Sequence, residues 1–397
     1  MKSIVVVGAS LAGLNAVRAL RENGFAGRIV VIGEEDARPY DRPPLSKQFL
    51  AGQMALADIA LERPNDHDLD AVWRLGVRAA GLDLTDRRVL IEGGSGESFD
   101  GLVIATGCRV RRLPLCDVPG VHVMRTADDS TRLRQAMQSG PRHVVIVGGG
   151  FIGAEVAATA VSAGHEVTIV EALDQPLGRV LGAEIGAAVA DLHRRHGVTV
   201  LTGVSVSDFK PDADGNVSSL KLSDGSVIAA DICVVSVGVM PNVEWLEGSG
   251  IDISDGVLCD ETCLVAPGIV AAGDVARWRN PLTGELRRIE HWDNAIRQAR
   301  HAAQRLLGGT AEPYRLLPWV WSDQYDRKLQ IYGSLTGSDE MKIVEGDLES
   351  FRFVALFRRG DRLAGVVAAN LAKPLLRYRK LLADGMSWEI ALAADRG

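Results

Sequence analysis

The chain has 397 residues, 47% of them hydrophobic and 24% charged, which excludes disordered and fibrous classes of protein. This length accommodates two or three domains with separate cores. The formal net charge of −7 offers no overall basic field for nucleic acid. Glycine is the outlier, with 43 residues, and the positions of these glycines are the most informative feature of the composition.

Five cysteines occur at widely spaced positions, Cys108, Cys116, Cys233, Cys259 and Cys263, and none forms a CxxC pair. Their odd number argues against a disulfide framework and favours a reducing compartment, so we expect a cytoplasmic protein. No His or second Cys pair accompanies the last two, which favours buried thiols over a metal site. No segment approaches the ~20 apolar residues of a membrane span.

The first predicted elements form a nucleotide-binding unit. Residues 3–7 (SIVVV) predict a buried parallel strand, and residues 11–22 carry apolar side chains at helical spacing. Between them lies GASLAG at 8–13, and a second predicted strand at 28–33 ends at Glu34. Glycines let backbone approach a pyrophosphate, the helix N-terminus stabilises its charge, and the acid receives a ribose hydroxyl. A serine replaces the middle glycine of this motif.

The same unit recurs later in the chain. Residues 143–147 predict a strand, GGGFIG at 148–153 is a full GxGxxG motif, and residues 154–163 predict a helix. A further strand at 167–170 leads into Glu171. Two such units with terminal acids make a generic α/β crossover a minority interpretation.

The acid of the second unit indicates which nucleotide is bound. Glu171 would accept a hydrogen bond from a ribose 2′-OH and repel a 2′-phosphate, which favours NAD over NADP. Arg179 lies close enough in sequence to leave the alternative open.

Two more apolar segments end in small-residue turns where a cofactor can approach closely. Residues 102–105 run into Thr106 and Gly107, and residues 269–272 run into Gly273 and Asp274. The first closes the opening nucleotide unit, whereas the second lies beyond the second unit. The first domain is therefore expected to be discontinuous. Beyond about residue 311 the pattern changes to Trp, Tyr and alternating strands, which indicates a third domain.

These motifs carry a resemblance to a known family. The chain resembles the FAD- and NAD-dependent ferredoxin reductases of bacterial oxygenase systems, within the superfamily of flavoproteins with two dinucleotide-binding domains. The resemblance covers essentially the whole chain. The order and spacing of its motifs make coincidence improbable: PYDRPPLSK at 39–47, ATG at 105–107, GGGFIGAE at 148–155, AAGD at 271–274, EHWDNA at 290–295 and WSDQYD at 321–326.

The resemblance implies an α/β fold with two Rossmann-like domains, the NAD domain inserted in the FAD domain, and a C-terminal α+β domain. The implied boundaries are 1–112 with 237–310 for FAD, 113–236 for NAD and 311–397 for the C-terminal domain.

The resemblance also implies FAD contacts throughout the chain. Glu34 would bind the adenosine ribose, Arg42 the diphosphate and Asp274 the ribityl chain. A surface role for Arg42, and helix capping by Asp274, are the alternatives. The full implied FAD set is Gly8, Ser10, Ala12, Gly13, Glu34, Arg42, Lys47, Ala79, Ala105, Thr106, Gly107, Arg111, Arg125, Gly273, Asp274, Glu290, Trp292 and Trp321.

Several members of this set have a structural alternative. Ala79, on an expected strand at 77–79, would either contact FAD or pack in the core. Arg125 would either contact FAD or join helices through salt bridges. Trp321 would cover the flavin or fill an aromatic core. Glu290 and Trp292 precede an expected helix at 294–307, whose N-terminus would stabilise negative charge on the reduced flavin.

The NAD contacts implied by the resemblance follow the second glycine motif. They are Gly148, Gly150, Phe151, Ile152, Gly153, Glu155, Glu171 and Gly238. Lys47 and Glu155 are the implied catalytic pair beside the isoalloxazine. A buried ammonium is costly unless it is paired, so we expect an ion pair between these two side chains.

The chain lacks the CxxxxC or CxxC pair that disulfide reductases of this superfamily place beside the flavin, and residues 42–47 contain no thiol. We therefore expect NADH to deliver hydride to FAD, and FAD to pass single electrons to a [2Fe–2S] ferredoxin. That ferredoxin would supply a cytochrome P450 or a Rieske oxygenase. The alternatives are an NADH:quinone or monodehydroascorbate-type reductase, or an NADH-binding flavoprotein with a signalling role.

Two basic segments are candidate docking sites for an acidic ferredoxin. Residues 277–305 hold seven Arg against three acids, and residues 352–380 hold eight basic residues against one acid. Solvated helix faces explain the same pattern equally well. The sequence gives no indication of oligomeric state.

Overall fold

The computed structural model describes residues 1–114 and 116–394. By its internal contacts the chain forms two compact units: unit 1 holds Met1–Asp41, Ile59–Arg109 and Met240–Val320, and unit 2 holds Arg42–Asp58, Val110–Val239 and the chain from Trp321 on. The chain passes between the two units after Asp41 and after Asp58, and within β8 (Cys108–Val110), β17 (Val239–Pro241) and β23 (Trp319–Gln324). These two units do not test the expected division into FAD, NAD and C-terminal domains, which stays a prediction.

Unit 1 is built on a six-stranded sheet in the order β19-β20-β7-β1-β2-β3. β1 pairs in parallel with both β2 and β7, and its Val and Ile side chains are fully buried because both faces of the sheet are covered. The strands are β1 (Ser3–Val7), β2 (Arg28–Ile32), β3 (Ala71–Arg74), β7 (Gly101–Ile104), β19 (Leu264–Ala266) and β20 (Ile269–Ala271).

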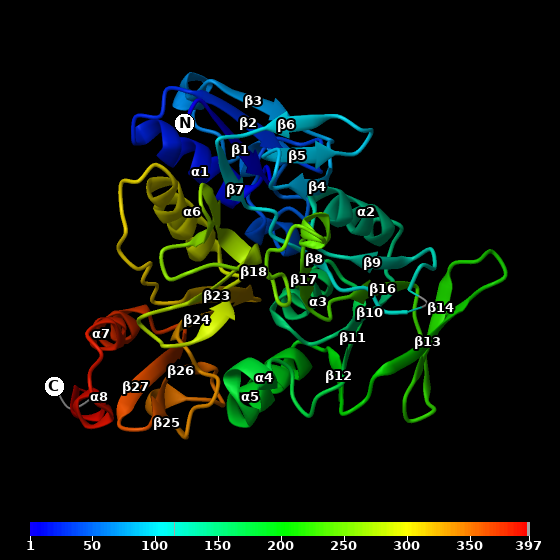
Figure 1. The fold of residues 1–397 in the computed structure, drawn as a ribbon. Coiled ribbons are helices and arrows are strands. Elements are labelled where there is room, and N and C mark those ends of the chain that lie inside the picture. Colours follow the sequence, from blue (N-terminus) through cyan, green and yellow to red (C-terminus); the bar gives the residue numbers. More distant parts are fainter. Residues whose placement is uncertain (115, 395–397) are drawn as a thin grey trace. The chain divides into compact units, whose positions relative to one another are not determined.

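Two helices lie side by side against this sheet, α1 (Leu11–Glu22) and α6 (Trp292–Leu306) (Figure 1). Their small alanine faces meet, and Arg300 pairs with Glu22 across them. Two small sheets complete unit 1, formed by β4 (Ala79–Asp83), β5 (Arg88–Ile91) and β6 (Gly96–Ser98), and by β18 (Val257–Leu258), β21 (Ala276–Arg279) and β22 (Leu286–Arg288).

Unit 2 repeats the central arrangement with a five-stranded parallel sheet in the order β12-β11-β10-β16-β9. Its strands are β9 (Val121–Val123), β10 (His143–Val147), β11 (Glu166–Glu171), β12 (Thr199–Thr202) and β16 (Ile232–Val235). Its helices are α2 (Ala127–Met137), α3 (Phe151–Ser162), α4 (Gly178–Leu181) and α5 (Ala183–Arg195).

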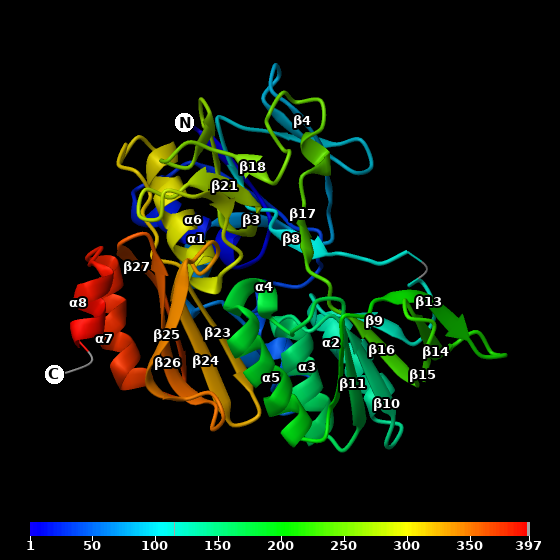
Figure 2. The ribbon, with the colours of Figure 1, turned by 90° about the horizontal axis from the view of Figure 1, so that it is seen from below.

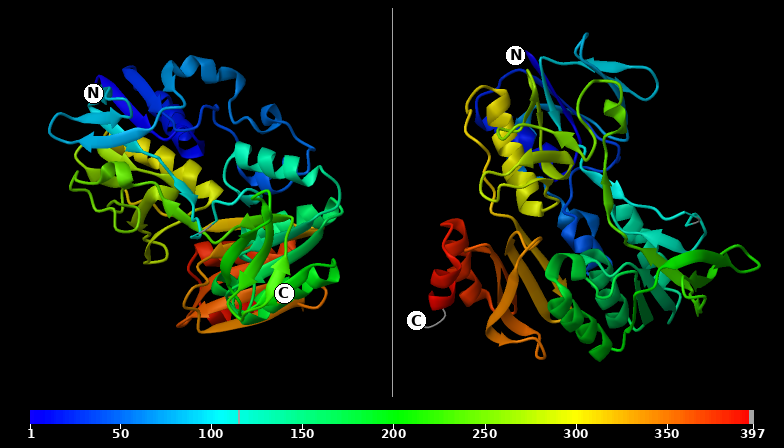
Figure 3. Two further views of the ribbon diagram at one scale, coloured as in Figure 1. Left: turned by 90° about the vertical axis from the view of Figure 1, so that its right-hand side faces the viewer. Right: turned by 60° about the horizontal axis from the view of Figure 1, so that its bottom comes forward.

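A three-stranded antiparallel sheet is inserted before β16, the strand of the parallel sheet that comes last along the chain. It consists of β13 (Val206–Pro211), β14 (Val217–Leu222) and β15 (Val227–Ala229). Its β13–β14 hairpin projects beyond the parallel sheet (Figure 3).

The C-terminal part of unit 2 is a five-stranded sheet in the order β23-β24-β27-β26-β25. Helices α7 and α8 lie on one face of it (Figure 2). The remaining elements are β24 (Arg327–Gly333), β25 (Glu340–Asp347), β26 (Arg352–Arg359), β27 (Arg362–Ala369), α7 (Ala372–Ala383) and α8 (Trp388–Ala393).

The predicted strands at 3–7 and 143–147 and the helix at 11–22 are confirmed. The expected strand at 77–79 is wrong, because Gly76 adopts a φ of +65° and turns the chain, so that β4 begins only at Ala79. Both later helices begin earlier than predicted. The first starts at Phe151 rather than 154, and α6 starts at Trp292, which therefore lies in the helix rather than before it.

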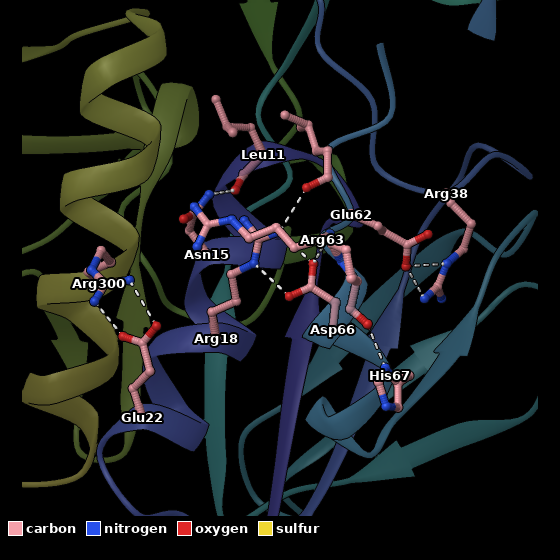
Figure 4. A network of polar contacts seen from close by, with 12 residues as sticks. Leu11, Asn15, Arg18, Glu22, Arg38, Glu62, Arg63, Asp66, His67 and Arg300 are labelled. Atoms are coloured by element: carbon pink, nitrogen blue, oxygen red, sulfur yellow. Dashed lines mark hydrogen bonds and ion pairs between the residues drawn. The ribbon is translucent and has the colours of Figure 1, made fainter. Parts of the chain in front are cut away.

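A buried ion pair joins α1 to the loop that precedes β3 in unit 1 (Figure 4). Arg18 Nε donates to Asp66 Oδ1 over 3.0 Å, and Arg18 Nη2 donates to the carbonyl of Leu61 over 2.7 Å. Burial raises the pKa of Asp66, but hydrogen bonds from Arg18 and from the backbone of Arg63 outweigh burial and leave this pKa below its usual value of 3.8. The pair therefore stabilises the fold above that pH.

We predict that Asp66→Asn lowers the free energy of unfolding by about 3 kcal/mol at pH 7, because Arg18 is left buried without its counter-charge. The difference from wild type should begin to shrink as the pH falls below about 3.8, the usual pKa of this carboxyl, and should be lost as the pH falls through the lower pKa of Asp66 in the folded protein. Denaturant unfolding at several pH values measures both effects. Asp68→Asn, at a side chain that is 73% exposed, should change stability little; an equal loss in both variants would contradict the prediction.

Candidate active site

The glycine loop of unit 1 is closely packed at two of its glycines. Gly8 follows β1 with a φ of +120°, and a Cβ there would overlap the carbonyl oxygen of Ala105. A Cβ at Gly13 would overlap the carbonyl oxygen of Gly8. Only glycine fits at either position, because the backbone at Gly8 lies against that of Ala105 and the backbone at Gly13 lies against that of Gly8.

The glycine loop of unit 2 repeats this packing. A Cβ at Gly148 would overlap the carbonyl of Ser236, and one at Gly153 would overlap the carbonyl of Gly148. The middle glycine differs, since Gly150 has a φ of −75° and no atom lies within 4 Å of its missing Cβ. Gly148 and Gly153 therefore serve packing, whereas Gly150 leaves open space in front of α3.

Both loops present an uncapped helix N-terminus. Ser10 precedes α1 and Gly150 precedes α3, and neither makes a side-chain capping hydrogen bond. Each loop also lies where the chain leaves the central strand of a parallel sheet, between neighbours on either side. Free N–H groups at such a switch point bind phosphate. The two loops thus fit the pyrophosphates of two dinucleotides.

An acid follows the second strand of each unit. Glu34 comes after β2 and is exposed, with Arg78 Nε 3.9 Å from its Oε1. Glu171 ends β11, where Oε2 accepts from Gly149 N over 2.7 Å and Oε1 from Leu173 N over 2.8 Å. Glu171 therefore orients the glycine loop in addition to its predicted contact with ribose.

The turn after β7 is held by a reciprocal pair of hydrogen bonds. Thr106 Oγ1 donates to the carbonyl of Asn242 over 2.7 Å, and Asn242 Nδ2 donates to the carbonyl of Thr106 over 2.9 Å. Ala105 is buried and Gly107 has a φ of +62°. Asn242 was not predicted from the sequence, because no motif contains it.

A second turn of unit 1 carries Asp274. Gly273 has a φ of +79°, and its N–H donates to Gln298 Oε1 over 2.9 Å. Asp274 lies within the short 3₁₀ turn Gly273–Val275, whose N-cap is Ala272, so the alternative that Asp274 caps a helix is wrong.

His291 is a site residue that sequence reasoning missed. It is the N-cap of α6, without a side-chain capping bond, and its buried Nδ1 has no hydrogen-bond partner among the described residues. Burial lowers its pKa to about 4, against the effect of Asp274. A neutral imidazole and an uncapped helix end beside Asp274 fit a polar ring edge such as that of a flavin.

The two other residues of this motif have defined partners in unit 1. Trp292 Nε1 donates to Asp41 Oδ1 over 2.7 Å. The exposed Glu290 pairs with Arg288 at 2.6 Å, and Arg288 Nη1 also donates to the carbonyl of Asp274 over 3.0 Å. Arg288 thus contacts both the Glu290 carboxylate and the backbone carbonyl of Asp274.

The predicted ion pair between Lys47 and Glu155 is confirmed in unit 2. Lys47 Nζ lies 2.6 Å from Glu155 Oε2, and the side chains are only 13% and 7% exposed. Glu155 is on the second turn of α3, and Lys47 directly follows the 3₁₀ turn Pro43–Ser46. Each charge lies in a largely buried place and is offset by the other.

Two serines and a backbone amide complete the surroundings of Glu155. Ser46 Oγ donates to Oε2 over 2.6 Å, Ser322 Oγ donates to Oε1 over 2.7 Å, and Asp323 N donates to Oε1 over 3.3 Å. Sequence reasoning missed both serines, although each stands within a motif of the chain, next to Lys47 or Trp321. Glu155 thus ties three distant segments together.

Arg42 and Arg125 are joined in unit 2. Arg42 Nη1 donates to the carbonyl of Arg125 over 2.7 Å, and Arg125 N donates to Asp129 Oδ2 over 3.2 Å. Arg111, with an exposed side chain, donates its N–H to the carbonyl of Gly238 over 2.9 Å.

The predicted site residues fall in both units. Those in unit 1 are Gly8, Ser10, Ala12, Gly13, Glu34, Ala79, Ala105, Thr106, Gly107, Gly273, Asp274, Glu290 and Trp292; those in unit 2 are Arg42, Lys47, Arg111, Arg125, Gly148, Gly150, Phe151, Ile152, Gly153, Glu155, Glu171, Gly238 and the half-buried Trp321. Their roles toward FAD and NADH remain predictions.

All five cysteines are free thiols and buried. Burial raises the pKa of Cys259 to about 12 and raises those of Cys233 and Cys263 further, which keeps these thiols protonated and unreactive. Residues 1–114 and 116–394 contain no cluster of three or more metal-binding side chains, and no helix among them is long and apolar enough to cross a membrane.

Comparison with known proteins identifies the family of the chain and its fold. Residues 2–299 match the family described as pyridine nucleotide-disulphide oxidoreductase, and residues 319–397 match a reductase C-terminal domain. The chain belongs to this oxidoreductase family. Membership implies FAD and NADH as cofactors, in agreement with the two glycine loops.

The family includes relatives similar along nearly their whole length. Rhodocoxin reductase of Rhodococcus erythropolis is 37% identical over 99% of this chain and 92% of its own. The ferredoxin–NAD(+) reductase component of the biphenyl dioxygenase system of Paraburkholderia xenovorans is 38% identical over 99% and 95%.

Two solved structures of this oxidoreductase family share the fold throughout. The ferredoxin reductase for the CYP199A2 system of Rhodopseudomonas palustris has a TM-score of 0.93, with 35% identity over 99% of this chain and 97% of that one. Putidaredoxin reductase in covalent complex with putidaredoxin has a TM-score of 0.92, with 31% identity over 97% and 93%.

We predict that Gly150→Ala folds normally but raises the KM for NADH about ten-fold or more, because the added methyl group occupies space next to the predicted pyrophosphate site. Gly153→Ala should lose thermal stability instead, because its Cβ overlaps the Gly148 carbonyl. Thermal unfolding and steady-state kinetics separate the two effects. Wild-type NADH binding by a folded Gly150→Ala would show that this space is not part of the NADH site.

We also predict that Glu171→Ala lowers the preference for NADH over NADPH about ten-fold, since the carboxylate no longer repels a 2′-phosphate or receives the 2′-OH. The measurement is kcat/KM for both nucleotides. Glu166→Ala, at the exposed start of the same strand, is the control and should keep the wild-type ratio. An unchanged ratio in Glu171→Ala would assign nucleotide choice to other residues.

Proposed function

We propose that this protein is an NADH-dependent ferredoxin reductase that delivers electrons to a [2Fe–2S] ferredoxin of an oxygenase system. The observation that carries the proposal is the buried Lys47–Glu155 ion pair. Glu155 lies two residues beyond the second glycine motif, on helix α3 of the NADH unit. Residues 42–47 contain no thiol, whereas disulfide reductases of this superfamily have a CxxxxC or CxxC pair beside the flavin. Electrons therefore have no protein sulfur to enter.

FAD, when bound, would supply the conversion of a two-electron hydride donor into a source of single electrons. The chain's part is to bind and orient. The N-termini of α1 and α3 stabilise the two pyrophosphates, and Glu171 selects the unphosphorylated ribose. Glu155 holds the Lys47 ammonium in a fixed direction, so that its positive charge favours an electron-rich neighbour.

A ferredoxin acceptor is supported by the names of the relatives. These include a dioxygenase-system ferredoxin–NAD(+) reductase and a reductase captured in complex with its putidaredoxin. The burial and raised pKa of Cys233, Cys259 and Cys263 disfavour dithiol chemistry in this chain. Reduction of a quinone or of monodehydroascorbate is the competing activity.

We infer a cytoplasmic location from the same thiols. The five cysteines are buried and none forms a disulfide bond, which suits a reducing compartment.

The decisive experiment is an anaerobic stopped-flow measurement. NADH should reduce the flavin of the purified protein much faster than NADPH does, and an acidic [2Fe–2S] ferredoxin should reoxidise it within turnover time. Glu155→Gln should slow reduction by NADH about ten-fold or more, because Lys47 loses its counter-charge. The exposed Glu166→Gln is the matched control.

Two results would contradict the proposal. One is slow reoxidation by every [2Fe–2S] ferredoxin of the host, together with rapid reoxidation by a quinone. The other is an unchanged rate of flavin reduction in Glu155→Gln, which would make the ion pair a structural element only.

A further inference from the structure

A row of buried polar side chains runs through unit 2 from Glu155 to helix α5. Ser322 and Gln324 point to the same face of β23 and are 0% and 2% exposed, and His193 of α5 is 0% exposed. Tyr325 follows β23 with a φ of +56°, an unfavourable conformation for a tyrosine. Polar groups this deeply buried require hydrogen-bond partners.

Hydrogen bonds join these side chains in two groups, one at Glu155 and one at His193. Ser322 Oγ lies 2.7 Å from Glu155 Oε1, and Gln324 Nε2 lies 3.3 Å from Ser322 Oγ. At the far end, the Tyr325 hydroxyl lies 2.8 Å from His193 Nδ1. Gln324 Oε1 and His193 Nε2 are both buried and have no other partner among the described residues.

The direction of each hydrogen bond follows from chemistry. The carboxylate of Glu155, paired with Lys47, can only accept, so Ser322 donates to it and in turn accepts from the Gln324 amide nitrogen. This leaves the Gln324 oxygen as an acceptor.

The protonation states of the far end fit the same direction. Burial raises the pKa of Tyr325, which keeps its O–H as a donor. Burial lowers the pKa of His193 to about 4, and the Gln324 side chain opposes this shift. A neutral His193 that accepts from Tyr325 at Nδ1 must carry its proton on Nε2.

We propose that Tyr325, His193, Gln324 and Ser322 form a directed hydrogen-bond chain that holds Glu155 in position opposite Lys47. The proposed chain requires a hydrogen bond from His193 Nε2–H to Gln324 Oε1, the two buried atoms that have no hydrogen-bond partner among the described residues. All donors then point toward the carboxylate, and such chains strengthen one another in a low-dielectric interior. The four are positioning residues, and through them α5 of the predicted NADH unit is connected to the reacting pair.

Other titratable and charged groups face both ends of this chain. At Glu155 they are Lys47 and Asp323, whose carboxylate lies 3.4 Å from Lys328 Nζ. At His193 they are Tyr325 and His196; His196 stacks on the Tyr325 ring at 3.6 Å and lowers the pKa of His193 further.

Nitrogen NMR of the flavin-loaded protein with ¹⁵N-labelled histidine tests the tautomer directly. We expect one histidine signal that is lost in His193→Gln. At pH 7 this signal should show a proton on Nε2 and no proton on Nδ1. Tyr325→Phe should disturb this tautomer, since the donor to Nδ1 is removed. A proton on Nδ1 in the wild type would overturn the proposed direction, whatever electron acceptor the protein uses.

The kinetic arm rests on the proposed function. Ser322→Ala should slow flavin reduction by NADH about ten-fold, the loss expected for a bond to a charged group. The loss should fall on the limiting rate at saturating NADH and leave the apparent Kd for NADH near the wild-type value, because the fully buried Ser322 acts through its contact with Glu155. Ser322→Thr, which keeps the hydroxyl, should restore the limiting rate.

Ser338→Ala is the control, since that hydroxyl caps only the Leu335 carbonyl. Gln324→Met provides a second test should Ser322→Ala fold poorly, and it should also lower the limiting rate of flavin reduction. A wild-type limiting rate in either variant, with the tautomer as expected, would restrict the chain to a structural role and overturn the positioning claim.

Discussion

A single buried carboxylate organises unit 2. Glu155 accepts hydrogen bonds from Ser46, Lys47, Ser322 and the backbone of Asp323, which come from the segment 42–58 and from β23. A charge this poorly exposed costs several kcal/mol unless it is paired and fully hydrogen-bonded. All of its hydrogen-bond donors are therefore needed together. They join the 3₁₀ turn before Lys47 and strand β23 to the start of α3, which carries Glu155.

The glycine loops of the two nucleotide units are packed in the same way. In each, the first and last glycines of the loop remove side chains from a contact between helix, strand and the neighbouring turn, at Ala105 in unit 1 and Ser236 in unit 2. They differ at the middle position, where Ser10 stands for Gly150. The shared packing is a requirement of the fold, and the difference at the middle position leaves each loop its own surface for a dinucleotide.

Much of the site is predictable because its residues stand in short motifs with a local physical meaning. The strands, the glycine loops and the partnership of Lys47 with Glu155 follow from apolar runs, from backbone crowding and from the cost of a buried charge. Ser46, Asn242, His291 and Ser322 could not be assigned roles in the same way. A serine or a histidine is compatible with many environments, and only its burial and its partners decide among them.

The sequence by itself determined the two dinucleotide units, the acids that follow their strands and the absence of a redox thiol pair, because these depend on local spacing and residue type. Only the tertiary structure decided that Glu155 has four donors, that burial lowers the pKa of His291 at the start of α6, and that Ser322 and Gln324 are buried next to Glu155. The physical reason is desolvation. Water is removed from these groups by segments far apart in the chain, and no local pattern records that combined effect.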